Sequence, residues 1–177
     1  AQRPDIVPLR LSDAQWREAC ATVDAVGRAR RQELGMRVVV HHHAGTYIET
    51  PLEVERLLAG TDPGNVGLLL DTGHYVYGGG DPVDVLNRHA DRVWHVHFKD
   101  CDADVAERAR AQGRGYLAAV RERLFCELGR GGVDFPAVLA ALRRVPFSMF
   151  HPQWSTIRLP SLLSTTRAIA ATIGRSF

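Results

Sequence analysis

Residues 92–100 have the sequence RVWHVHFKD, and this stretch decides the fold class together with two similar stretches before it. Its β-branched and aromatic residues are typical of a buried strand, and its last residues are polar. The run MRVVV at 36–40 is followed by HHH at 41–43, and the run NVGLLL at 65–70 is followed by DTGH at 71–74. Nearly continuous apolar runs of this kind are typical of parallel strands that are covered on both faces. The three stretches therefore predict parallel strands.

Helix signals lie between these strands. Ser12 and Gln15 form a capping-box pattern, and Gly35 is a natural stop for the helix that follows. Thr50 and Pro51 predict the start of a second helix. Further helices are expected over 82–90, 102–123 with a break at 113–115, 134–144 and 162–173, and a fourth strand is expected at 146–150.

The alternation of helices and strands predicts an α/β fold with a parallel sheet. An open doubly wound sheet and a portion of a (β/α) barrel both fit this order. No linker-like stretch interrupts the chain, so residues 1–177 are expected to form a single domain. No glycine-rich phosphate loop follows a strand, which weighs against a nucleotide-binding fold.

The composition argues against several classes of protein. The net charge of the 177 residues is +2, with acids and bases interleaved, so no basic surface for nucleic acid is expected. No apolar run approaches the roughly 20 residues of a membrane span, and the first residues lack the apolar core of a signal peptide. The three cysteines follow no pattern and indicate free thiols in a reducing compartment. We therefore expect a cytoplasmic protein that binds neither nucleic acid nor membranes.

Histidines gather at the expected carboxyl ends of the strands, where parallel α/β folds build their sites. Asp71 and Lys99 follow two of the same strands. Imidazoles and a carboxylate from different strands are typical ligands of a divalent metal ion. Seven of the eight histidines lie at or near such ends: His41, His42, His43, His74, His95, His97 and His151.

Each of these groups also has a structural interpretation. A single histidine at a strand end is more often structural, and Asp71 could simply cap the following turn. Strand alternation places His95, His97 and Lys99 on one face. The same alternation places His41 and His43 together and points His42 away. The minimal predicted metal set is Asp71, His97 and one of His41 or His43.

The motifs HHHAGT at 41–46, TDPGNVGLLLDTGH at 61–74 and HVHFKD at 95–100 occur together and in order. With ELGRGGVDF at 127–135, they resemble the myo-inosose-2 dehydratases of inositol catabolism, which belong to the xylose isomerase-like superfamily. The resemblance implies a (β/α)₈ TIM barrel, of which the predicted strands match about strands five to eight. Because half a barrel exposes strand edges, we expect a homo-oligomer or pairing with a missing N-terminal half.

The same resemblance implies site residues and a cofactor. It implies Mn²⁺ or Co²⁺ at the barrel mouth, with Zn²⁺ or Mg²⁺ as alternatives. Its metal ligands map to Asp71, His97 and His41, and His151 would replace a glutamate that the family carries in its last strand. It further implies His74 as a substrate contact. We expect Lys99 and His74 to be the catalytic residues and His43, His95 and Lys99 to be further substrate contacts, with a structural role as the alternative for His95.

The implied reaction is that of a hydro-lyase. The metal ion would polarise the carbonyl of 2-keto-myo-inositol, one residue would remove the neighbouring proton, and another would protonate the departing hydroxyl to give a cyclohexane dione. A lysine beside a cation is expected to have a lowered pKa. Two alternatives remain open: a sugar isomerase or epimerase that uses the same metal-bound chemistry, and an inactive half-barrel that binds only a metal ion or a partner subunit.

Overall fold

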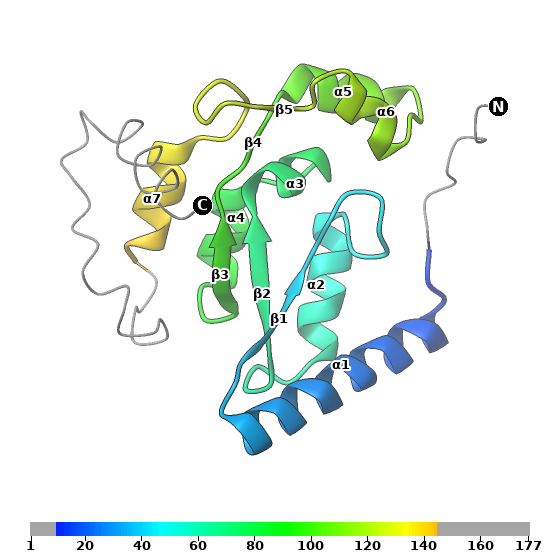
Figure 1. The fold of residues 1–177 in the computed structure, drawn as a ribbon, viewed down its shortest axis with the longest axis vertical. Coiled ribbons are helices and arrows are strands. Elements are labelled where there is room, and N and C mark those ends of the chain that lie inside the picture. Colours follow the sequence, from blue (N-terminus) through cyan, green and yellow to red (C-terminus); the bar gives the residue numbers. More distant parts are fainter. Residues whose placement is uncertain (1–9, 145–177) are drawn as a thin grey trace.

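The computed structural model describes residues 10–144 as a parallel sheet flanked by helices (Figure 1). Its strands are β1 (Val38–His41), β2 (Val66–Asp71), β3 (Val93–His97), β4 (Asp100–Cys101) and β5 (Phe125–Cys126). Its helices are α1 (Asp13–Leu34), α2 (Pro51–Gly60), α3 (Thr72–Tyr77), α4 (Pro82–Arg88), α5 (Ala103–Ala111), α6 (Tyr116–Arg121) and α7 (Phe135–Leu142). The order of elements confirms the predicted α/β class.

The sheet consists of β1, β2 and β3 in that order, and both strand pairs are parallel. His41 is the register partner of Leu69, and Asp71 is the register partner of His97. The carboxyl ends of all three strands therefore meet at one edge. Figure 1 shows the short β4–β5 ribbon and helices α5 and α6 beyond that edge.

A β-bulge interrupts the pairing of β2 with β3. Leu68 pairs with Val93, and Leu69 pairs with His95, which leaves Trp94 as an extra residue. Such a bulge shifts the strand by one residue and thereby changes which face the later side chains occupy. The bulge therefore decides the direction of every side chain that follows in β3.

The main hydrophobic core lies between the sheet and helices α2, α4 and α7. Leu68 and Leu70 of β2 are fully buried against Val54 of α2, Val85 of α4 and Val138 of α7. Since fully burying one aliphatic side chain is worth about 1.5–3 kcal/mol, this core holds the sheet and the three helices together. A second cluster packs α5 and α6 against residues of the β4–β5 ribbon.

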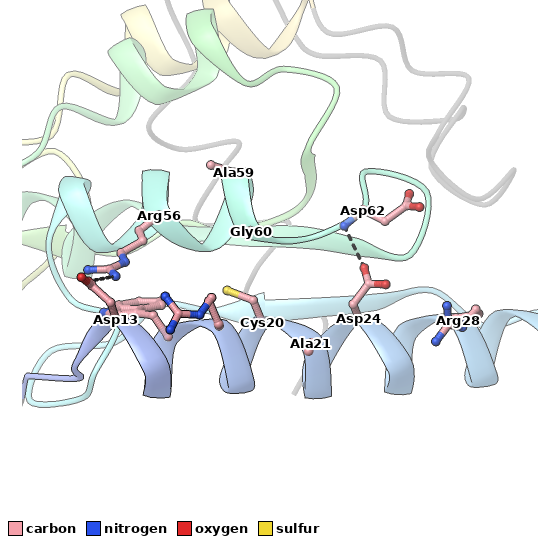
Figure 2. Close-up of a pocket in the computed structure, with 11 residues that line it drawn as sticks. Asp13, Cys20, Ala21, Asp24, Arg28, Arg56, Ala59, Gly60 and Asp62 are labelled. Carbon is pink, nitrogen blue, oxygen red and sulfur yellow. Dashed lines mark hydrogen bonds and ion pairs between the residues drawn. The ribbon is translucent and has the colours of Figure 1, made fainter.

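Helix α1 packs along α2 on the outside of the sheet (Figure 2). Cys20 lies so close to Gly60 that a Cβ at residue 60 would come 2.6 Å from its sulfur. An ion pair joins Asp13 to Arg56 at one end of the contact. The groove between the two helices has a volume of about 790 Å³, and its lining includes none of the predicted site residues.

The predicted helix caps are confirmed. Ser12 with Gln15 and Thr50 with Glu53 form complete capping boxes at the starts of α1 and α2. Gly35 adopts the left-handed conformation and ends α1. The helix expected to reach residue 90 ends at Arg88.

Other predictions differ from the structure or lie outside it. DTGH, expected as a turn, contributes the first residues of helix α3, and the two-residue strands β4 and β5 were not predicted. The strand expected at 146–150, the helix expected at 162–173 and His151 lie outside the described residues. No helix within residues 10–144 is long and apolar enough to cross a membrane.

Candidate metal centre

Strands β1, β2 and β3 each contribute one side chain to a compact group at their carboxyl ends. One ligand atom each from His41, Asp71 and His97 lies within 4.8 Å of the others. Asp71 Oδ2 is 3.6 Å from His41 Nε2 and 3.6 Å from His97 Nδ1. Of the alternatives His41 and His43, the structure brings His41 to Asp71.

The bulge at Trp94 sets the direction of His97. Val93 and Val96 both pack in the main core, although residues three apart in a regular strand point to opposite faces. The extra residue therefore places His97 on the face away from that core, opposite Asp71. In a regular strand beginning with buried Val93, His97 would lie on the core side.

The two carboxylate oxygens of Asp71 make different contacts. Its Oδ1 accepts a hydrogen bond from the His74 amide at 3.0 Å and so caps α3. Its Oδ2 lies 3.1 Å from Lys99 Nζ and faces the two histidines. Burial alone would raise the pKa of Asp71, but the His74 amide and the nearby charge of Lys99 outweigh it and lower the pKa. Asp71 is therefore the cap of α3, and its second oxygen remains directed toward His41 and His97.

The residues between Asp71 and His74 position Lys99. The Thr72 hydroxyl accepts the Lys99 amide hydrogen at 2.9 Å and donates to the Lys99 carbonyl. A Cβ at Gly73 would come 2.9 Å from Lys99 Cγ, so the absence of a side chain lets the lysine pass. The Lys99 ammonium lies 4.8 Å from the centre of the Phe125 ring, a cation–π contact.

His74 lies deeper than expected for a substrate contact. Its side chain is buried, and the His43 ring lies over it with centroids 3.8 Å apart. His74 Nδ1 accepts the Ala44 amide hydrogen at 3.3 Å, so the ring proton is on Nε2. Burial lowers the pKa of His74 to about 3, which keeps the ring neutral at neutral pH.

Two aromatic residues that the sequence analysis did not single out pack beside His43 and His74. Tyr116 lies 5.3 Å from His43 and Phe125 lies 5.1 Å from His74, measured between ring centroids. Nothing in their local pattern indicates this position, which depends on how α6 and β5 fold back over the sheet. The exposed His95 lies beside His97, with ring centroids 5.4 Å apart.

The donors of this group fit a divalent metal ion. Asp71 Oδ2 and His41 Nε2 are buried without a well-aligned hydrogen bond among the described residues. One carboxylate oxygen and two imidazole nitrogens are ligands that Zn²⁺, Mn²⁺ and Co²⁺ accept. His41, Asp71 and His97 would therefore hold the ion.

Asp100 anchors a loop at the same end of the sheet. Its Oδ2 accepts the amide hydrogens of Gly129 at 2.8 Å and Gly131 at 2.9 Å. Its Oδ1 accepts those of Cys101 at 2.9 Å and Val133 at 3.2 Å. Loop 127–133 is thus fixed by its backbone to one fully buried carboxylate.

Comparisons with known proteins agree with this fold. The model of a family described as "Xylose isomerase-like TIM barrel" matches residues 5–157. The inosose dehydratase of Geobacillus kaustophilus is 44% identical over 141 residues, which cover 78% of this chain and 45% of that protein. The chain therefore spans about half the length of the curated relatives that it matches.

Two solved structures share the fold at low sequence identity. The probable 3-DHS dehydratase AsbF of Bacillus anthracis matches with a TM-score of 0.59 and 22% identity, over 75% of this chain and 48% of that one. The IOLI protein with a bound zinc atom matches with a TM-score of 0.57 and 16% identity, over 97% of this chain and 61% of that one. Both support the TIM-barrel architecture.

Proposed function

This chain belongs to the xylose isomerase-like TIM barrel family, and from that premise we propose that it forms part of a metal-dependent dehydratase of inosose-like cyclic ketones. The inosose dehydratase relative supports the reaction class. The observation that carries the proposal is the group of His41, Asp71 and His97 with Lys99 beside it. A dehydratase of this kind needs a site for the carbonyl and a group that moves a proton close to it.

The reaction removes water from a ketone: the C–H bond next to the carbonyl and the C–O bond of the hydroxyl on the following carbon break, and a C=C bond forms between these two carbons. When bound, a divalent ion supplies Lewis acidity at the carbonyl. With its amine neutral, Lys99, whose Nζ lies 3.1 Å from Asp71 Oδ2, would take the proton from the carbon and then pass it to the leaving hydroxyl, which departs as water. The buried, neutral His74 would support the His43 ring that lies over it, and His43 would contact the substrate.

The choice of metal ion is part of the proposal. The two imidazoles of the group favour Mn²⁺, Co²⁺ or Zn²⁺ over Mg²⁺, which prefers oxygen ligands. The IOLI neighbour, whose structure is described with a bound zinc atom, is consistent with a divalent ion in this fold. We propose 2-keto-myo-inositol as the substrate, on the basis of the inosose dehydratase relatives.

The test uses the intact protein that contains this chain, stripped of metal and then titrated with Mn²⁺, Co²⁺ and Zn²⁺ in separate experiments. Formation of the dione from 2-keto-myo-inositol is measured at each step. We expect activity to return with one of these ions, and we expect Asp71→Ala and His97→Ala to abolish metal binding and turnover together. The control is His89→Gln, because His89 lies beyond α4 and pairs with Glu55 on the outside of the sheet.

Full activity of Asp71→Ala or His97→Ala would overturn the proposal. Conversion of a ketohexose into its C3 epimer, without dehydration of the inosose, would instead support the isomerase or epimerase alternative. Metal binding without turnover of either substrate would support the third alternative, an inactive chain.

A further inference from the structure

His42 lies immediately after the end of β1 and is fully buried. Its Nε2 accepts the amide hydrogen of Asp71 at 3.1 Å. Because a backbone amide only donates, Nε2 must carry a lone pair, and the ring proton of neutral His42 is on Nδ1. The bond therefore joins one defined tautomer to the backbone of the aspartate in the metal group.

This hydrogen bond fixes the backbone of Asp71 at the junction of β2 and α3. The His74 amide holds Asp71 Oδ1, and His42 holds the Asp71 backbone amide. With both points fixed, the carboxylate keeps its remaining oxygen, Oδ2, directed toward His41 and His97. A ligand group held in this way is already arranged before an ion arrives, which favours binding.

The packing around His42 would accept an apolar ring, so packing alone does not explain why the residue is a histidine. The Tyr75 ring packs edge-on against it, with centroids 5.2 Å apart. Within the part of the chain that the structure describes, His42 Nδ1 is buried without a hydrogen-bond partner. A buried polar atom without a partner destabilises the folded state, and an apolar ring of similar size would avoid this cost. The polar ring therefore needs a role that offsets this cost, and the bond to Asp71 provides one.

We propose that His42 is a positioning residue whose acceptor nitrogen holds Asp71 in the orientation that binds the metal ion. The role of His42 toward the ion rests on the proposed function, whereas its hydrogen bond to Asp71 does not. The two parts call for separate measurements on the intact protein.

The first measurement detects the bond in the metal-free protein by nuclear magnetic resonance. We expect scalar coupling across the N–H···N bond between the Asp71 amide and His42 Nε2, and a ¹⁵N shift of Nε2 typical of an unprotonated ring nitrogen. Protonation of Nε2 in the native protein at neutral pH would overturn the inference without affecting the proposed metal group.

The second measurement is calorimetric titration with Mn²⁺, Co²⁺ and Zn²⁺. His42→Phe keeps a ring but removes the acceptor, and we expect it to lower metal affinity about 10- to 100-fold, as for other residues that orient a ligand. His42→Gln carries an oxygen that reaches the Asp71 amide, and it should restore most of the affinity. Tyr75→Phe, a change in the ring that packs against His42, should leave the affinity unchanged.

Equal affinity in the wild type and in folded His42→Phe overturns the inference while the proposed function stands. A wild type that binds none of the ions overturns the proposed function and the role of His42 toward a metal. If circular dichroism shows that His42→Phe does not fold, His42→Asn takes its place, because its shorter side chain does not reach the amide. Equal affinity of the Asn and Gln variants would then overturn the inference.

Discussion

Asp71 combines a helix cap and a candidate metal ligand in one side chain, since Oδ1 binds the His74 amide and Oδ2 faces His41 and His97. An asparagine in its place keeps a cap oxygen, because asparagine is as good a cap as aspartate. The same substitution removes the negative charge that attracts a cation. The two roles can therefore be separated by experiment.

We predict that Asp71→Asn lowers the free energy of unfolding by less than about 1 kcal/mol, whereas Asp71→Ala loses the cap and costs about 1–2 kcal/mol more. Both variants should lose metal affinity by about 100-fold or more, because neither supplies a charged ligand oxygen. Urea denaturation and metal titration of the two variants check the prediction. Undiminished metal affinity in Asp71→Asn would contradict it.

Buried histidines give the fold a dependence on pH. Burial lowers the pKa of His42 from 6.5 to about 4 and that of His74 from 6.5 to about 3. Between pH 6.5 and these values the unfolded chain binds more protons than the folded chain, so stability falls as the pH is lowered. Stability from the neutral rings is fully present above pH 6.5.

We predict that the free energy of unfolding of the metal-free protein drops between pH 7 and pH 4, with about 3 kcal/mol of the drop due to His42. His42→Phe should show a smaller drop over the same range, because its ring cannot be protonated. Urea denaturation at several pH values measures both curves. Parallel curves for the wild type and the variant would show that His42 does not contribute.

At the scale of secondary-structure elements, the bulge in β3 makes the direction of His97 depend on the packing of Trp94 against β2. Trp94, the extra residue, lies over Gly67 of β2, where a Cβ would come 2.2 Å from the indole ring. A side chain at residue 67 must therefore displace the indole and with it the strand that carries His97. The direction of His97 depends on this contact between neighbouring strands.

We predict that Gly67→Ala destabilises the protein by about 1–3 kcal/mol, as overpacking in a well-packed core does, and weakens metal binding by moving His97. Gly115→Ala is the matched control, since nothing lies within 4 Å of a Cβ at that glycine and its φ of −67° suits any residue. Thermal unfolding and metal titration compare the two variants. Wild-type stability in Gly67→Ala would contradict the packing argument.

What the sequence could predict at this scale follows the range of the interactions. The capping boxes of α1 and α2 join residues three apart, so they are visible in the sequence. The bulge, the β4–β5 ribbon and the places of Tyr116 and Phe125 depend on residues distant in the chain. The grouping of His41, Asp71 and His97 was predictable because parallel strands bring their carboxyl ends together, whereas the burial of His74 was not.

At the scale of the whole molecule, the described residues form three parallel strands of a barrel architecture, and the chain spans 45% of its inosose dehydratase relative from Geobacillus kaustophilus. Strand β1 is an edge strand of this sheet within the described residues. Unpaired backbone groups along an edge are a template for pairing with another strand. We propose that β1 pairs with a further strand in the working protein.

We predict that residues 1–177, expressed alone, associate with a second copy through β1 and give a concentration-dependent mass in light scattering. Val39→Lys should weaken the association, because a charge on an edge strand opposes pairing. Leu52→Lys is the control, since Leu52 is 77% exposed at the start of α2. A constant monomer mass for the unmodified chain would contradict the prediction.

The backbone anchoring of loop 127–133 by Asp100 determines where this protein tolerates change. Gly131 must stay a glycine, because a Cβ there would come 2.4 Å from Asp100 Oδ1. Glu127 and Arg130 leave 86% and 77% of their side chains exposed, and their side chains take no part in holding the loop to Asp100. The residues at these two positions can therefore be substituted while the loop keeps its shape. An engineer can therefore change the surface chemistry of this loop at these two residues without redesigning the barrel.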